Sequence, residues 1–173
     1  MSFPSNLTPH QAAAFWQLKL LNADDVEKLA MSWLEAGFEA PELAIIAGTQ
    51  SPTLREIGED FVAALSALTG RDQLSNNEAG RIALAFYLEE MISGRMNAFD
   101  ASREILKLQH LEIKLFKKTE YAGSELGIEM LLGTYYSIDD IDCPSQETIE
   151  KELISEAKKV LVRITTTSDH EHS

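Results

Sequence analysis

The segment WLEAGFEAPELAIIAG, residues 33–48, decides the fold of this chain because it predicts a helix, a tight turn and a second helix. Apolar residues at helical spacing lead up to Gly37, and glycine commonly ends a helix in the left-handed conformation. Pro41 fits the first turn of the next helix, which is expected to end near Gly48. DNA-binding helix-turn-helix proteins share this pattern, so the segment raises the question whether the chain reads DNA.

The charges of this segment argue against DNA binding. A helix that reads DNA presents Arg, Lys, Asn or Gln to phosphates and bases, whereas the second helix here has one charged residue, Glu42. Glu35 and Glu39 add negative charge on either side of the turn. Trp33, four residues before Gly37, stands where that motif usually has a small residue. We therefore interpret the segment as two packed helices and expect no direct contact with nucleic acid.

The rest of the chain also predicts helices. Thr8 with Gln11, and Ser75 with Glu78, form capping-box patterns at the start of two of them. The segment HLEIKLFKK, residues 110–118, alternates for a few residues, so a short strand stays open there, although continuation of a helix is favoured. Start and stop signals give roughly seven to eight helices, expected over residues 9–21, 24–37, 41–48, 52–70, 75–94, from 98 or 101 onward with Asn97 or Asp100 as the cap, within 121–137 and over 144–163.

The predicted fold is all-α, a single compact multi-helix domain. The chain of 173 residues has the size of one domain, and it contains no long run of Pro, Gly or Ser that would serve as a linker. Ile82–Ile92 is apolar on most sides and is expected at the centre of the core, with the stripe of Ile149–Ile164 packed across it. We expect the domain to cover residues 1–165 and residues 166–173 to form a flexible tail.

A formal net charge of −13, from 28 acidic and 15 basic side chains, limits the possible partners. Such a field repels nucleic acid and anionic lipid and attracts basic surfaces. No apolar run approaches the ~20 residues that span a bilayer, and the N-terminus lacks a signal-peptide pattern. Cys143 is the one cysteine, so no intrachain disulfide can form. These features predict a cytoplasmic protein that does not enter a membrane.

Motifs for metal and cofactor chemistry are missing from the sequence. The four histidines, at positions 10, 110, 170 and 172, form no HExxH pattern, and a single cysteine cannot supply a structural zinc site. The Walker loop, GxGxxG and GxSxG patterns are not present either. Cys143 precedes Pro144 at a predicted helix start, where its pKa could be lowered, but we interpret it as structural. We expect no metal and no cofactor.

Two pairs of carboxylates leave an enzyme open as an alternative. Glu89 and Glu90 end an otherwise apolar helix, so one of them could be buried, and Glu125 and Glu129 lie four residues apart on one helical face. General acid–base catalysis needs one such carboxyl with a raised pKa. The competing interpretation is that both pairs lie on solvated faces.

The best candidate for a functional surface is the segment GTYYSIDDIDCPS, residues 133–145. Tyrosine offers rigid amphipathic contact area, and aspartate complements Arg or Lys on a partner. The proposed partner-binding residues are Tyr135, Tyr136, Asp139, Asp140 and Asp142. In the alternative interpretation the segment only connects two helices, with solvated acids and inward isoleucines.

In size, charge and helical character the chain resembles the small acidic immunity proteins with which bacteria neutralise secreted toxins in the cytoplasm. LEEMISGRMNAFDASREIL, residues 88–106, also resembles a helix, glycine turn, helix segment of other bacterial proteins. The resemblance implies a non-enzymatic inhibitor of a basic partner protein, often a nuclease with a basic groove, and it assigns no residue a role. A structural or oligomeric adaptor is a third possibility.

Overall fold

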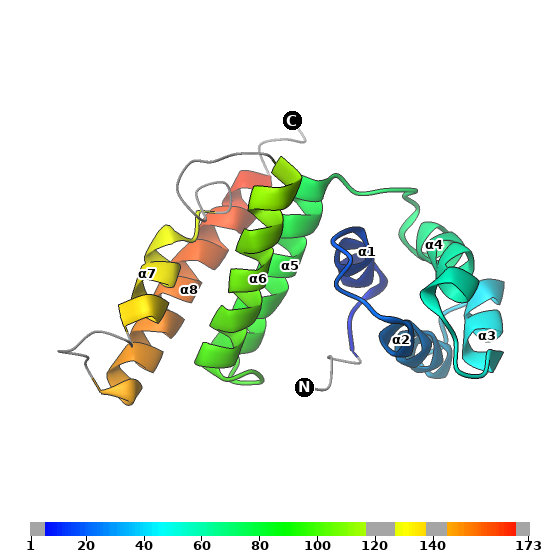
Figure 1. Ribbon diagram of the computed structural model, residues 1–173, viewed down its shortest axis with the longest axis horizontal. Coiled ribbons are helices and arrows are strands. Elements are labelled where there is room, and N and C mark those ends of the chain that lie inside the picture. Colours follow the sequence, from blue (N-terminus) through cyan, green and yellow to red (C-terminus); the bar gives the residue numbers. More distant parts are fainter. Residues whose placement is uncertain (1–5, 117–126, 138–144, 169–173) are drawn as a thin grey trace. The chain divides into compact units, whose positions relative to one another are not determined.

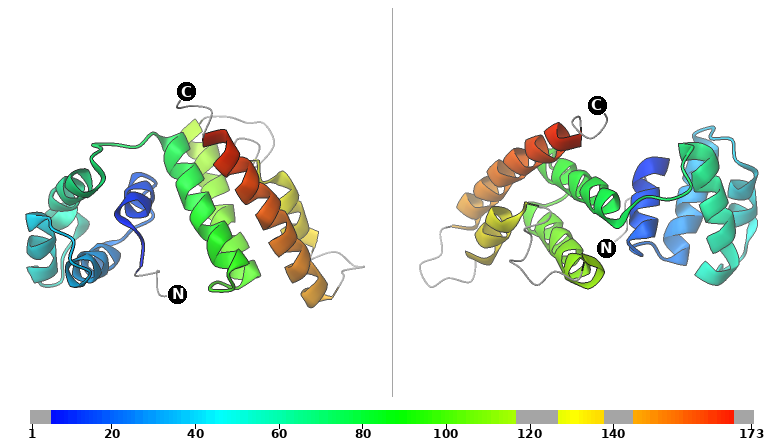
Figure 2. Two further views of the ribbon diagram at one scale, coloured as in Figure 1. Left: turned by 180° about the vertical axis from the view of Figure 1, so that it is seen from behind. Right: turned by 90° about the horizontal axis from the view of Figure 1, so that it is seen from above.

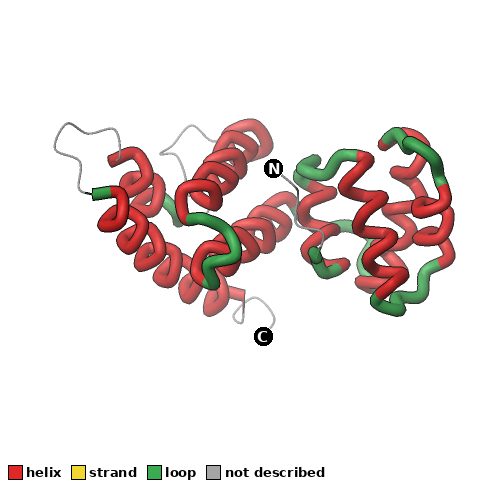
Figure 3. The backbone as a smooth tube through the Cα atoms, turned by 90° about the horizontal axis from the view of Figure 1, so that it is seen from below, coloured by secondary structure: helices red, strands yellow, loops and turns green. Residues whose placement is uncertain are grey.

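The computed structural model describes residues 6–116, 127–137 and 145–168, apart from the side chains of residues 109–116 and 166–168. These residues form eight α-helices and no strand (Figures 1 and 3), which confirms the predicted all-α class. Residues 110–116 are helical, so the strand left open there is not formed. The helices are α1 (Pro9–Gln17), α2 (Ala23–Glu35), α3 (Pro41–Gly48), α4 (Leu54–Thr69), α5 (Asn76–Ile92), α6 (Ala98–Phe116), α7 (Glu129–Tyr136) and α8 (Gln146–Ser168).

Contacts between Cα atoms divide the chain into two compact units, the N-terminal unit Met1–Ala79 and the C-terminal unit Gly80–Ser173. The boundary falls within the first turn of α5. The sequence did not predict this boundary, because the boundary lies inside a helix and no Pro/Gly/Ser-rich linker marks it. A single domain over residues 1–165 stays a prediction, and each unit is described by itself.

The N-terminal unit is a layer of four short helices in which α2 packs on α3, and α4 packs on α1, α2 and α3 (Figure 1). Its core contains a row of aromatic rings. Phe61 lies between Trp16, at a ring-centroid distance of 5.2 Å, and Trp33, at 6.0 Å. Trp33 is buried, and its indole N–H donates to the Leu7 carbonyl at 2.9 Å. This bond satisfies a polar group that would otherwise be costly inside the core.

Capping boxes lie at the starts of the first two helices, and the sequence predicted the first of them. At α1, Thr8 accepts a hydrogen bond from the Gln11 N–H, and the Gln11 side chain accepts one from the Thr8 N–H. The helix ends at Gln17, earlier than the predicted residue 21, because Lys19 adopts a left-handed conformation with φ +58°. At α2, Asn22 and Asp25 form the same reciprocal pair. Each cap satisfies backbone donors that the helix cannot pair internally.

The opening segment forms the predicted helix, turn, helix. Gly37 follows α2 with φ +83°, and its N–H donates to the Leu34 carbonyl at 3.0 Å. The Phe38 N–H donates to the Trp33 carbonyl at 2.9 Å, and the two rings lie 6.3 Å apart. These two bonds and the ring contact constitute a Schellman motif. The interpretation as two packed helices is confirmed, since α2 and α3 contact each other directly.

In the C-terminal unit, α7 lies along α8, and α6 contacts both of these helices (Figure 2). α5 supplies Leu84, Leu88 and Met91 to the core, and α8 supplies its regular stripe from Ile149 to Val160. α8 continues to Ser168, beyond the predicted residue 163, and within its last turns the Thr165 hydroxyl donates to the Leu161 carbonyl at 3.0 Å. Such a bond lets threonine remain in a helix.

Candidate partner-binding surfaces

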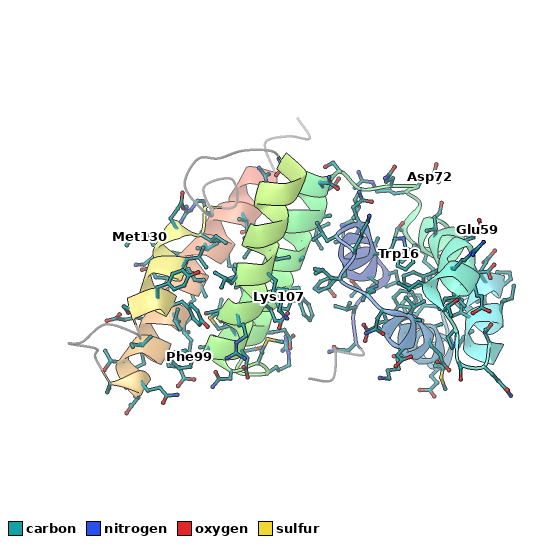
Figure 4. All side chains as sticks on the ribbon, viewed as in Figure 1. Trp16, Glu59, Asp72, Phe99, Lys107 and Met130 are labelled. Atoms are coloured by element: carbon teal, nitrogen blue, oxygen red, sulfur yellow. The ribbon has the colours of Figure 1, made fainter. Side chains whose placement is uncertain are left out.

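The two predicted tyrosines lie at the C-terminal end of α7. Leu131 and Leu132 are buried and hold this short helix against its neighbours. Tyr136 is 52% exposed and Met130 is 70% exposed. Figure 4 labels Met130 on α7. Tyr135 is half-buried, and the two tyrosine rings meet edge to face at 5.6 Å. We call Met130, Tyr135 and Tyr136 the α7 surface.

The three predicted aspartates, Asp139, Asp140 and Asp142, lie outside the described residues, as does Cys143. The structure therefore places the tyrosines and leaves the acidic part of the predicted site as a prediction. α7 ends at Tyr136, three residues before the first aspartate in the sequence. Gly127, which lies just before α7, is held by a residue of α8, because the Arg163 guanidinium donates a hydrogen bond to the Gly127 carbonyl at 3.1 Å.

A second exposed apolar surface lies on the last turns of α2 and on the turn that follows this helix, and sequence reasoning missed it. Met31, Leu34 and Phe38 are 37–47% exposed, although they follow one another at helical spacing, three and four residues apart. The helical spacing that leads up to Gly37 includes Leu34, but the buried stripe of α2 consists of Val26, Leu29, Ala30 and Trp33. The sequence signal that could have revealed this surface is the presence of large apolar residues outside a stripe that already suffices to pack α2 against its neighbours. We call Met31, Leu34 and Phe38 the α2 surface.

Acidic residues dominate the sequence around the α2 surface. Glu35 and Glu39 are exposed beside it, and Lys28 is the one basic residue within residues 20–50. On α3, the Glu42 Oε2 atom is buried and has no hydrogen-bond partner among the described residues. A buried carboxylate oxygen gains from a cationic donor. The exposed apolar side chains of the α2 surface, with Glu35 and Glu39 beside them in the sequence, suit an apolar segment that carries Lys or Arg.

Glu90, one of the carboxylates that left an enzyme open as an alternative, is buried in an ion pair. Glu89 is exposed, while Glu90 is 7% exposed. The Arg95 Nε and Nη2 atoms lie 2.8 and 2.7 Å from Glu90 Oε1, and this hydrogen bond raises the pKa of the Arg95 guanidinium. Glu90 thereby ties α5 to the turn that follows it. Of the second pair, Glu129 is exposed and Glu125 lies outside the described residues.

Three other groups have shifted pKa values, each with a local cause. The hydrogen bond from Arg71 lowers the pKa of Glu78, and the hydroxyl and backbone N–H of Thr53 lower the pKa of Glu56. Burial, followed by the charge of Glu104, raises the pKa of the Tyr87 phenol. These shifts follow from capping, ion pairing and burial, and none of the three groups lies on the α2 or α7 surface.

Within the described part of the chain, no group of three or more His, Cys, Asp or Glu side chains could hold a metal ion. His10 is exposed on α1, and the other three histidine side chains lie outside the described residues. None of the described helices has the length and apolar character needed to cross a bilayer.

Comparison with protein-family models, with curated proteins and with solved structures gives no match to this chain.

Proposed function

We propose that this chain is a non-enzymatic protein-binding module that acts in the cytoplasm as an inhibitor and covers a basic surface of a partner protein. The observation that carries the proposal is the exposure of Met130 and Tyr136 on α7, directly before the acidic segment in the sequence. Exposed aromatic and Met side chains are enriched at the centres of interfaces. Acidic neighbours add attraction to a basic partner.

Binding would combine steric and electrostatic occlusion. Tyr135 and Tyr136 are the proposed anchors, and Asp139, Asp140 and Asp142 the proposed contacts to Lys or Arg of the partner. The formal charge of −13 would accelerate association with a basic protein and would favour it over acidic competitors. A toxin or nuclease with a basic groove is the class of partner that fits this charge.

The α2 surface supports the same function from the N-terminal unit. It offers three exposed apolar side chains with Glu35 and Glu39 beside them. That unit carries 11 acidic and 4 basic side chains in residues 1–79. The α2 and α7 surfaces are therefore two places at which one kind of partner could be bound, and variants of each distinguish them.

The test is affinity purification from a lysate of the source organism, with the wild-type chain and surface variants as bait. The α7 variant combines Tyr136→Ala with Asp139→Asn, Asp140→Asn and Asp142→Asn. The α2 variant combines Met31→Lys with Leu34→Lys. Val162→Lys is the matched control, because Val162 is an exposed apolar residue on α8. We expect the α7 variant to retain about tenfold less of a basic partner, which corresponds to about 1.4 kcal/mol.

The possible outcomes test the proposed function and the proposed binding site separately. Loss of the partner in the α2 variant alone would leave the function standing and would move the site to α2. A partner retained equally by all variants would contradict both surfaces. A partner that is acidic, or the release of a reaction product from candidate substrates, would contradict the function itself.

A further inference from the structure

A groove in the N-terminal unit lies outside both surfaces described above. It consists of two adjoining hollows of about 310 and 630 Å³, which share Trp16, Val62 and Asp72. Figure 4 labels Trp16 on α1, Glu59 on α4 and Asp72 on the segment after α4, and all three line the groove. We call this feature the Trp16 groove.

The floor of the groove is preformed. A Cβ atom at Gly58 would lie 3.5 Å from Trp16 Cη2 and 3.6 Å from Trp16 Cζ2, so the indole lies directly over the glycine on α4. Behind it, Phe61 meets the indole edge to face at 5.2 Å. Phe61 itself is fully buried and stacked on Trp33. The indole is therefore held between a helix backbone and the aromatic core, while it remains half-buried and faces the groove.

One wall of the groove is an apolar stripe on α4. Leu54, Gly58 and Val62 follow at intervals of four residues, and Leu54 and Val62 are each 41% exposed. The stripe extends over about 12 Å, or about two turns of a helix. The larger hollow lies along this stripe and is open to solvent, whereas the smaller one lies deeper and includes the buried side chains of Leu65 and Leu74.

The end wall is fixed by hydrogen bonds. Asp72 accepts from the Ser66 hydroxyl at 2.7 Å, which holds the segment after α4 against the end of that helix. Gln17 on α1 donates to the Asn76 side chain at 2.8 Å. Because the wall is already in place, binding in the groove would not require an ordering step, and this lowers the entropic cost of binding.

The charges around the groove favour a cationic partner. Glu59 and Asp72 are exposed at its edge. Of the two arginines that line it, Arg71 is paired with Glu78, and Arg55 lies near one end. Residues 1–79, which contain the whole groove, carry 11 acidic and 4 basic side chains, and this net negative charge favours a basic partner.

We propose that the Trp16 groove binds an amphipathic helical segment of a partner protein. The apolar stripe of the segment lies along Leu54 and Val62, one large apolar side chain enters the smaller hollow beside Trp16, and Lys or Arg side chains lie near Glu59 and Asp72. A hydrophobic groove of this kind recognises residues spaced at three and four along a helix. A second copy of this chain fits less well, because both copies carry a charge of −13. The proposal does not rest on the α7 surface.

The test uses the full chain and three synthetic peptides of about 16 residues, long enough to become helical on binding. The first has leucines at i, i+3, i+4 and i+7 and lysines on the opposite face. The second replaces lysine by glutamate, and the third scrambles the first so that the stripe is lost. Binding is followed by two-dimensional ¹H–¹⁵N NMR, in which the Trp16 and Trp33 indole N–H groups are the only tryptophan signals, and Trp16→Phe assigns them.

We expect the first peptide to bind with a Kd of about 1 mM or tighter and to shift the Trp16 indole signal more than that of buried Trp33. Val62→Glu should weaken binding at least about tenfold, because it places a charge on the apolar wall. Ile45→Glu is the matched control, because it adds the same charge at an exposed apolar residue of α3 that does not line the groove, and it should bind like the wild type. Tyr136→Ala is the control at the other proposed surface and should also bind like the wild type.

Three results would overturn the proposal that the Trp16 groove binds a cationic amphipathic helix. They are equal binding of the scrambled peptide, tighter binding of the glutamate peptide, and unchanged affinity in Val62→Glu. Failure of all three peptides to bind would contradict the proposal as well. Each of these results leaves the α7 surface untouched, so the failure of one proposal is distinguishable from the failure of the other.

Discussion

Gly37 is the residue at which the chain turns from α2 into α3. Its φ of +83° lies in the left-handed region, which side chains with a Cβ rarely adopt. No atom lies within 4 Å of where a Cβ would be placed, so a substitution there is penalised by the backbone conformation and not by a clash.

Gly37→Ala should therefore lower the free energy of unfolding by about 1–2 kcal/mol. Gly48→Ala is the matched control in the same unit. Gly48 is the last residue of α3, has no positive φ and has open space around its Cα atom. Alanine there should leave stability unchanged or raise it by up to about 1 kcal/mol. Urea unfolding of both variants measures the difference, and equal effects would rule out the conformational explanation.

Two glutamates give a residue-level test by pH. Hydrogen bonds lower the pKa of Glu78 and of Glu56 below the ordinary value of 4.5. Their ionised forms therefore stabilise the fold above pH 4.5, and this contribution is lost as the pH falls through the lowered pKa values. In ¹³C NMR titrations, Arg71→Gln should raise the pKa of Glu78 alone, and Thr53→Val that of Glu56 alone. A variant that moved both or neither would contradict the assigned causes.

At the scale of single residues, the features that depend on local chemistry could be predicted from the sequence. The Gly37 turn and the Thr8 cap follow from conformational preference and from short-range hydrogen bonds. The exposure of Leu34 and the ion pair of Glu90 with Arg95 could not be predicted in this way. Both depend on which side of a helix meets its neighbours, and this is decided by contacts between distant segments.

Among the elements, α2 shows how a cap and a stripe cooperate. Asn22 accepts a hydrogen bond from the Asp25 N–H, and Asp25 accepts one from the Asn22 N–H, each at 3.0 Å. Asn22→Ala removes one bond of this pair and should cost about 1 kcal/mol in urea unfolding, whereas Asn22→Ser keeps a capping oxygen and should cost much less. Equal losses in the two variants would show that the cap contributes little to α2.

The helices themselves were predicted well because their periodicity and punctuation are local. Their ends were predicted less well: α1 stops early at the left-handed Lys19, and α8 runs on to Ser168. The candidate site was predicted in part. α7 leaves Tyr136 exposed and Tyr135 half-buried. Helical spacing relates the residues of the α2 surface, but their exposure depends on how α2 packs, and the Trp16 groove forms only where α1 meets α4.

For the whole molecule, the two compact units give a prediction about cooperativity. Both tryptophans lie in the N-terminal unit, so tryptophan fluorescence follows that unit, while far-UV circular dichroism follows helices of both. We expect the two probes to give different midpoints in urea. Coincident transitions would indicate a single cooperative fold and would favour the one-domain prediction.

The measurement that tests the central claim most directly is capture of the partner by the wild-type chain from a lysate of the source organism at about 0.15 M and about 1 M salt, with mass spectrometry of the retained proteins. The screening length falls from about 8 to about 3 Å between these conditions. The account predicts one dominant basic protein that is retained at low salt and largely lost at high salt. Retention of no specific protein, or of an acidic one that is insensitive to salt, would contradict it.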